Sequence, residues 1–235
     1  MNKMNKCLFI VLLFFCVITS PVQAERVLDI QEITSENGIT AWLVEDHSVP
    51  VIAMDFDFEG LGAILDPPEK QGLTYMLGNM LTEGAGDLNA QEFQKQLQNY
   101  SISLSFAGSR DHFMGSLKTL TRNKDKAFEL TNLALSNPSF DDEPFERQKR
   151  ASMARIRSSL ADPNWVAARI MNDVAYAGHP YAKNSGGTLT TLPAITQDDL
   201  RSFTKNFAKN RLRVAVAGDI TAQETEAVVN AANKA

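Results

Sequence analysis

Cysteine is nearly absent from this 235-residue chain, and its two copies, Cys7 and Cys16, both lie near the N-terminus. The 211 residues that follow position 24 contain none. That part of the chain therefore cannot form a disulfide, and it offers no thiolate to a metal or to a nucleophilic mechanism. Its stability has to come from a packed core, and a chain of this length can bury roughly 70% of the surface that it exposes when unfolded.

Residues 1–24 have the pattern of an export signal peptide. A short basic start with Lys3 and Lys6 precedes an apolar run from Cys7 to Ile18, and Val22-Gln23-Ala24 forms a small-residue cleavage site. The apolar run is shorter than the ~20 residues that a membrane-spanning helix needs. We therefore expect an exported protein, periplasmic or extracellular, with no stable membrane span after cleavage; an uncleaved anchor is the alternative.

Basic residues are too few to predict nucleic-acid binding. After position 24 the chain has 21 basic and 28 acidic residues, a net charge of −7, whereas phosphate binding needs a concentrated basic face. The densest basic run, from Arg147 to Arg157, holds five basic residues. This run is typical of the solvated side of a helix.

Histidine is also scarce, and the common hydrolase and phosphate-binding motifs are missing. The three histidines, His47, His112 and His179, are each more than 60 residues from the next, so that only the fold could bring them together. We expect no shared site, and we expect His179 to support the turn at Pro180-Tyr181. The chain has no Gly-x-Ser-x-Gly sequence and no phosphate loop, and Gly186-Gly187 is more typical of a turn.

Hydrophobic periodicity predicts an α+β fold in one domain over residues 25–235. Asn37-Gly38 is a strong hairpin signal between the first two strands. The order of elements indicates a mostly antiparallel sheet with helices packed on one face. We expect strands at 27–34, 39–46, 51–59, 101–107, 111–120 and 212–217, and helices at 70–82, 89–99, 122–136, 142–160, 164–177, from the cap Thr196 to 208, and from the cap Thr221 onward.

The strand at 51–59 alternates most clearly. Asp55 and Asp57 share one of its faces, and the solvent side of a sheet explains this pair better than metal ligation does. The opposite, buried face carries Ile52, Met54, Phe56 and Phe58.

The helix that opens at Gly72 has the frame of a zinc-peptidase helix without its ligands. In inverted zinc peptidases, His-x-x-Glu-His places two imidazoles on one helical face, with a carboxylate between them that deprotonates the metal-bound water. Those slots here hold Tyr75, Gly78 and Asn79. The rest of the frame resembles the pitrilysin/insulinase/mitochondrial-processing-peptidase family, with matches at Gly72, Leu73, Met80 and Gly84.

Further motifs agree with this family in order and spacing, so that the similarity covers residues 27–232. The chain is identified as a non-catalytic member of the family, corresponding to its N-terminal domain; relatives usually carry two such domains in tandem. The matching segments are Asn37-Gly38, Val44–Pro50, His179-Pro180-Tyr181, Gly186-Gly187-Thr188, Ile195–Leu200 and Asn210–Thr221.

The resemblance also implies where a third metal ligand should lie. In the family this ligand is a glutamate about 75 residues past the second histidine, and counting from Asn79 leads to the region of Ala154. No acid occurs there, and Arg155 would bring a positive charge toward the site instead. We therefore expect no catalytic residue, no metal and no cofactor, zinc being the cofactor of active relatives.

The resemblance implies a catalytically inactive subunit. Its partner would be an active zinc-peptidase subunit of the same family, with which it would form a heterodimer enclosing a chamber, and an extended peptide would bind there by strand addition. Two alternatives stay open, a zinc-dependent endopeptidase with ligands elsewhere in the chain and a purely structural scaffold subunit. The sequence does not identify the exposed edge strand.

Overall fold

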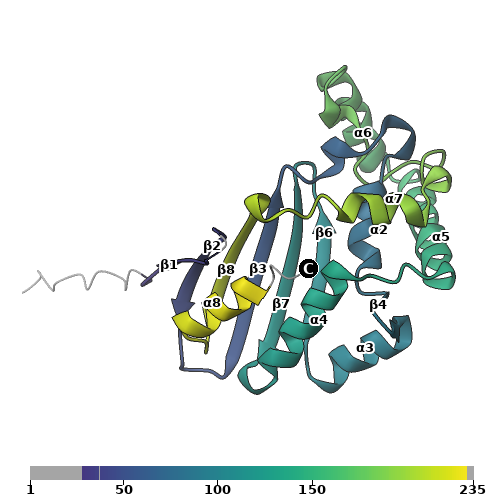
Figure 1. Ribbon diagram of the computed structural model, residues 1–235. Coiled ribbons are helices and arrows are strands. Elements are labelled where there is room, and N and C mark those ends of the chain that lie inside the picture. The colour runs from purple at the N-terminus through teal and green to yellow at the C-terminus, as the bar shows by residue number, and fades with distance from the viewer. Residues whose placement is uncertain (1–27, 37, 232–235) are drawn as a thin grey trace, which may run out of the picture.

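The computed structural model describes residues 28–36 and 38–231, and the predicted signal peptide lies outside them. The fold is α+β, as predicted (Figure 1). A six-stranded sheet has the order β1-β2-β8-β3-β7-β6, and helices α4 and α8 pack on one of its faces. Within the described residues, no helix is both long and apolar enough to cross a membrane.

The predicted strands are present, with small shifts at their ends. Neighbouring strands are antiparallel except for the parallel pair β2–β8, so the sheet is mostly antiparallel. The first strand is shorter than predicted and begins at residue 31. The bounds are β1 Gln31–Thr34, β2 Thr40–Glu45, β3 Val51–Glu59, β6 Ser103–Gly108, β7 His112–Leu120 and β8 Leu212–Gly218.

The last strand, β8, is inserted between β2 and β3, which are consecutive in the sequence. Gly218 closes this insertion. Its φ is +125°, and a Cβ there would lie 2.0 Å from the carbonyl oxygen of Val51. Only glycine fits, because the residue combines a left-handed backbone with close approach to the neighbouring strand. Asp46 and Asp219 then donate backbone hydrogen bonds to Gly218 and Val51, respectively.

The helices also lie where the periodicity predicts them. A short two-stranded hairpin, β4 Gly84–Ala85 with β5 Leu88–Asn89, was not predicted. Asn89 is confirmed as an N-cap, and it forms a capping box with Glu92. The helix bounds are α2 Leu73–Met80, α3 Ala90–Asn99, α4 Lys124–Ser136, α5 Asp142–Ser159, α6 Pro163–Ala175, α7 Gln197–Thr204 and α8 Ala222–Ala231.

Two predicted helices were too long. The predicted helix at 70–82 begins only at Leu73, because Gly72 has a left-handed φ of +93° and residues 68–70 form a separate 3-10 turn. The helix predicted to reach 208 ends at Thr204. Beyond that point the chain turns so that Phe207 stacks on Phe58 of β3 with ring centroids 4.7 Å apart. Tertiary packing thus overrides the helical pattern of that segment.

The core lies between the sheet and the helices and is rich in phenylalanine. The predicted inward face of β3 is confirmed, since Phe56 and Phe58 are both at least 95% buried. Phe106 of β6 packs edge-on to Phe56 with centroids 6.0 Å apart. Burial of each such ring stabilises the fold by about 1.5–3 kcal/mol. Between them on β7 lies Gly115, where a Cβ would be 2.1 Å from the Phe56 ring.

Candidate degenerate metal site and edge strand

Helix α2 is fixed at its start by a buried carboxylate. Asp66 is 1% exposed and accepts hydrogen bonds from the backbone N–H groups of Gly72 and Thr74 and from the Thr74 hydroxyl, at 2.9, 3.1 and 2.5 Å. Burial raises the pKa of Asp66, and these hydrogen bonds oppose the rise. A carboxylate at this position satisfies N–H groups that a helix leaves unpaired at its N-terminus. The next residue along the helix is Tyr75, the first degenerate position.

The three degenerate positions share one face of α2, as their spacing requires. Gly78 lies against the edge strand β6, where a Cβ would be 3.1 Å from the Phe106 carbonyl oxygen and 3.2 Å from the Cα of Ala107. The Asn79 amide donates a 3.1 Å hydrogen bond to the carbonyl oxygen of Tyr75. Tyr75, Gly78 and Asn79 are therefore brought together beside β6.

A fourth side chain at the site is that of Arg155 of α5. Its guanidinium carbon lies 4.6 Å from the centre of the Tyr75 ring, and its Nη2 donates a 3.3 Å hydrogen bond to the carbonyl oxygen of Gly186. The prediction that Arg155 brings positive charge to the site is confirmed. Counting along the sequence pointed to the region of Ala154, and in the structure it is the neighbouring residue, Arg155, whose side chain contacts Tyr75.

These side chains do not fit zinc. Zinc in proteins takes nitrogen, sulfur or carboxylate ligands, whereas the site offers a phenol, a bare backbone, a carboxamide and a guanidinium. The Asn79 amide group is already bound to its own helix, and the guanidinium would repel a cation. Across residues 28–36 and 38–231, no group of three or more His, Cys, Asp or Glu side chains is placed to hold a metal ion.

The three histidines have separate partners. His47 Nδ1 lies 2.6 Å from Asp219, and that hydrogen bond raises the pKa of His47. His112 Nδ1 lies 2.8 Å from Asp57. His179 accepts a hydrogen bond from the backbone N–H of Tyr181, which confirms its predicted role in that turn. Asp57 thus pairs with a histidine on the solvent side of the sheet, as its predicted placement there allows.

Gly186 and Gly187 form a turn that also contacts the start of α2 and Arg155. Gly187 has a φ of +79°, and it packs so closely on Gly72 that a Cβ on Gly72 would lie 2.7 Å from the Gly187 Cα. The loop also supplies the carbonyl that Arg155 binds. The glycine pair therefore joins the start of α2 to the arginine that faces Tyr75.

Strand β6 is the sheet edge beside the degenerate site, and among the described residues no strand pairs with its outer side. At the β6–β7 turn the backbone N–H of Ser109 donates a hydrogen bond to the carbonyl oxygen of His112. Hydrogen-bonded pairs alternate along an antiparallel ladder, so the N–H and C=O groups of Leu104 and Phe106 point away from β7. Of these outward groups, the carbonyl oxygen of Phe106 faces Gly78 of α2.

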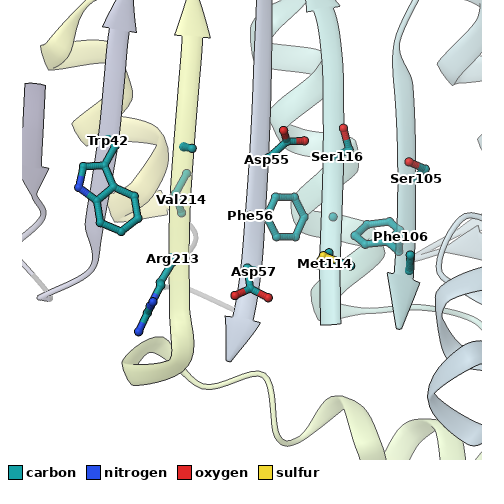
Figure 2. Close-up of a pocket in the computed structure, with 13 residues that line it drawn as sticks. Trp42, Asp55, Phe56, Asp57, Ser105, Phe106, Met114, Ser116, Arg213 and Val214 are labelled. Carbon is teal, nitrogen blue, oxygen red and sulfur yellow. The ribbon is translucent and has the colours of Figure 1, made fainter. Parts of the chain in front are cut away.

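The face of the sheet opposite to the helices carries a shallow groove with a volume of about 500 Å³ (Figure 2). Trp42 of β2 and Met114 of β7 are 39% and 41% exposed on this face, together with Ser105, Asp55 and Arg213. Sequence reasoning missed this surface. The signal was present, because Trp42 lies out of phase with the buried neighbours on its strand.

Comparison with known proteins gives a match to the family model described as insulinase, peptidase family M16, over residues 52–188. The chain belongs to the M16 family. The matched region contains α2, β6 and Arg155, and thus every part of the degenerate site. The structure confirms the family fold.

The similar proteins include one named as a non-peptidase homologue and one named as a zinc protease. A non-peptidase homologue, YmxG of Helicobacter pylori, is 28% identical over 182 residues, which cover 77% of this chain and 42% of that protein. The zinc protease PqqE of the same organism is 26% identical over 199 residues, 83% of this chain and 44% of that protein.

A solved structure agrees in fold. The crystal structure described as a peptidase M16 inactive domain from Pseudomonas fluorescens superposes with a TM-score of 0.83 at 21% identity, and it covers 88% of this chain and 50% of that one. The chain thus spans about half the length of the relatives that it matches. It is an M16 homologue in which a non-catalytic role fits the chemistry of the site.

Proposed function

We propose that this protein is an exported, catalytically inactive M16 subunit that pairs with an active zinc peptidase of the family and binds extended peptides along β6. The observation that carries the proposal is the replacement of all the metal-site side chains, which leaves Arg155 stacked on Tyr75. A zinc peptidase needs a metal to lower the pKa of its attacking water to about 7. A chain without ligands for the metal can still bind peptides, and we propose that this is its role.

The edge of β6 supports peptide binding. Main-chain groups at a sheet edge pair with any extended peptide, whatever its side chains. Leu104 and Phe106 direct such groups outward, and the degenerate site lies directly beside them. The other sheet edge, β1, is only four residues long, so β6 is the better candidate for strand addition.

The open face of the sheet supports the chamber part of the proposal. Surface residues on a sheet are normally polar, yet Trp42 and Met114 lie exposed here around a groove. Such side chains are enriched where proteins contact other chains. We propose that this face lines a chamber shared with an active subunit.

The relatives support the choice of partner, because one organism has both a non-peptidase homologue and a zinc protease similar to this chain. Export rests on the signal-peptide pattern of residues 1–24. We therefore propose that the pair works in the periplasm or outside the cell.

The first test is metal content. We expect purified protein to contain far less than one zinc per chain and to show no change in Tm when a chelator is added, because a true zinc site contributes several kcal/mol or more to folding. Stoichiometric zinc, lost on chelation together with peptide cleavage, would favour the endopeptidase alternative instead.

The second test separates a peptide-binding partner from a scaffold. An active M16 subunit should co-purify with the chain, and short unstructured peptides should slow hydrogen exchange at the backbone amides of Leu104 and Phe106 while leaving β1 unchanged. Co-purification without any peptide-dependent protection of β6 would support a purely structural scaffold.

A further inference from the structure

The degenerate site is positively charged where an active family member would bind a cation. Arg155 has no carboxylate of the described residues within ion-pair distance, whereas Arg147 on the same helix pairs with both Glu83 and Glu143. Lys149, also on α5, lies 3.6 Å from Glu146. The guanidinium that faces the site is therefore left without an opposing negative charge in this part of the chain.

Several hydrogen-bond donors at the site are available to a ligand. A guanidinium has five N–H donors, and the structure uses one of those of Arg155, for the carbonyl of Gly186. The Tyr75 hydroxyl has no hydrogen-bond partner among residues 28–36 and 38–231, and it is not a buried atom. One hydrogen of the Asn79 amide is taken by the Tyr75 carbonyl, and the second is free.

Arg155 is an exposed residue, and contacts with two parts of the protein orient its guanidinium. Its guanidinium lies over the Tyr75 ring, a favourable cation–π geometry. On the other side it meets the glycine loop, where a Cβ on Gly186 would be 3.0 Å from Nη2. Asn184 accepts a hydrogen bond from the N–H of Gly186 and fixes that loop. A cation held in this way loses less entropy when it binds a ligand.

We propose that Arg155 and Tyr75 bind a carboxylate group of a peptide that lies along β6. The inference rests on the proposed function and names the chemistry that this site selects. A planar guanidinium and a carboxylate form paired, charge-assisted hydrogen bonds. Gly78 provides the connection, because the absence of a side chain there leaves the site directly beside the main chain of Phe106 and Ala107. The carboxylate is either a peptide C-terminus or an Asp or Glu side chain.

The experiment uses three fluorescently labelled peptides of otherwise identical, unstructured sequence. The first has a free C-terminal carboxylate, the second a C-terminal amide, and the third a C-terminal amide with one internal Gln replaced by Glu. Fluorescence anisotropy gives Kd for each. We expect one of the two carboxylate peptides to bind about tenfold more tightly than the neutral peptide, the size expected for a charge-assisted hydrogen bond. Which peptide gains affinity identifies the source of the carboxylate.

The variants locate the effect. Arg155→Gln should abolish the preference for carboxylate, and Arg155→Lys should restore only part of it, because lysine keeps the charge but loses the planar fork. Arg157→Gln is the matched control, since it removes the same charge from an exposed position two residues further along α5. The Tm of each variant, compared with that of the wild type, shows whether it has folded.

Two results would overturn the inference. The first is that all three peptides bind the wild type with equal affinity. The second is that Arg155→Gln and Arg157→Gln lose the preference for carboxylate to the same extent, which would indicate an effect of overall positive charge rather than of Arg155. Hydrogen exchange distinguishes this failure from that of the proposed function. If the neutral peptide protects β6 but carboxylate gives no gain, only the carboxylate site is wrong; if no peptide protects β6, peptide binding itself is wrong.

Discussion

The charge at position 155 decides whether the α2 face can accept a metal, and it can be tested by restoring part of the ligand set. The first variant, Tyr75→His with Asn79→His, provides two imidazoles one helical turn apart. The second adds Arg155→Glu. Both keep Gly78, because a Cβ there would already lie 3.1 Å from the Phe106 carbonyl oxygen, and the family glutamate at that slot acts on water rather than on the metal.

The expected magnitude follows from the distance between Arg155 and the site. The guanidinium carbon lies 4.6 Å from the centre of the Tyr75 ring, so a dication held there would be at ~5 Å. At that distance the repulsion is roughly 2 kcal/mol at the dielectric constant of water and roughly 7 kcal/mol at an effective value of about 20. Arg155 is exposed, so the lower figure applies, which is a weakening of roughly 20-fold in Kd.

Glutamate at position 155 reverses the sign of this interaction and adds a coordinating oxygen. The variant with three substitutions should therefore bind zinc roughly 400-fold more tightly than the variant with two, because removing a roughly 20-fold weakening and adding an equal attraction multiply. Competition against a coloured chelator measures both values. Arg157→Glu in the two-histidine background makes the same change of charge away from the site, and it should recover little. Zinc affinities of the two- and three-substitution variants within threefold of each other would refute the assigned role of Arg155.

Three further substitutions probe the fold and are measured by urea unfolding. Gly115→Ala should lower the free energy of unfolding by about 1–3 kcal/mol, because the cost of overpacking against Phe56 exceeds the ~0.5–1 kcal/mol gained by removing a glycine. In a Phe56→Leu background the same substitution should cost less. If the two substitutions are additive, the clash between residue 115 and Phe56 is contradicted. Asp66→Ala should lower the free energy of unfolding by about 2–4 kcal/mol, since it leaves buried N–H donors at the start of α2 unpaired. A decrease below about 0.5 kcal/mol, which is usual for a surface substitution, would argue against the role of Asp66 in fixing that helix. The hydrogen bond from Lys124 lowers the pKa of Glu224 to about 2, so the stabilisation by Glu224 is present above pH 4.5 and is lost as the pH falls toward 2. Because Glu224 is 39% exposed, Glu224→Gln should lower the free energy of unfolding by only about 1 kcal/mol at pH 7. The same loss at pH 2 would contradict this pH dependence.

The sequence predicts elements better than it predicts their neighbours. Alternation along residues 51–59 identifies β3 and its buried face, because one side of that strand packs on the core. No local pattern indicates that β8 lies between β2 and β3, since this pairing joins residues far apart in the chain. The end of α7 was missed for a similar reason, as the contact of Phe207 with Phe58 is tertiary.

In the degenerate site, too, local patterns are predicted from the sequence and tertiary contacts are not. Tyr75, Gly78 and Asn79 are found by their spacing, because the helical repeat places them on one face. Arg155 approaches that face through the packing of α5 on α2, which a residue count locates only to within one position. The outer edge of β6 could not be deduced at all, because strand order depends on the whole sheet.

The central place of β8 has a consequence for how the chain is made. The sheet cannot close until residues 212–218 have left the ribosome, because until then β2 and β3 have no strand between them. During this time β1-β2 and β3-β7-β6 are separate, and their unpaired edges and apolar faces are exposed to aggregation. Such exposure is typical of folds dominated by contacts distant in sequence. A nascent chain that stops before residue 212 should therefore need a holding chaperone.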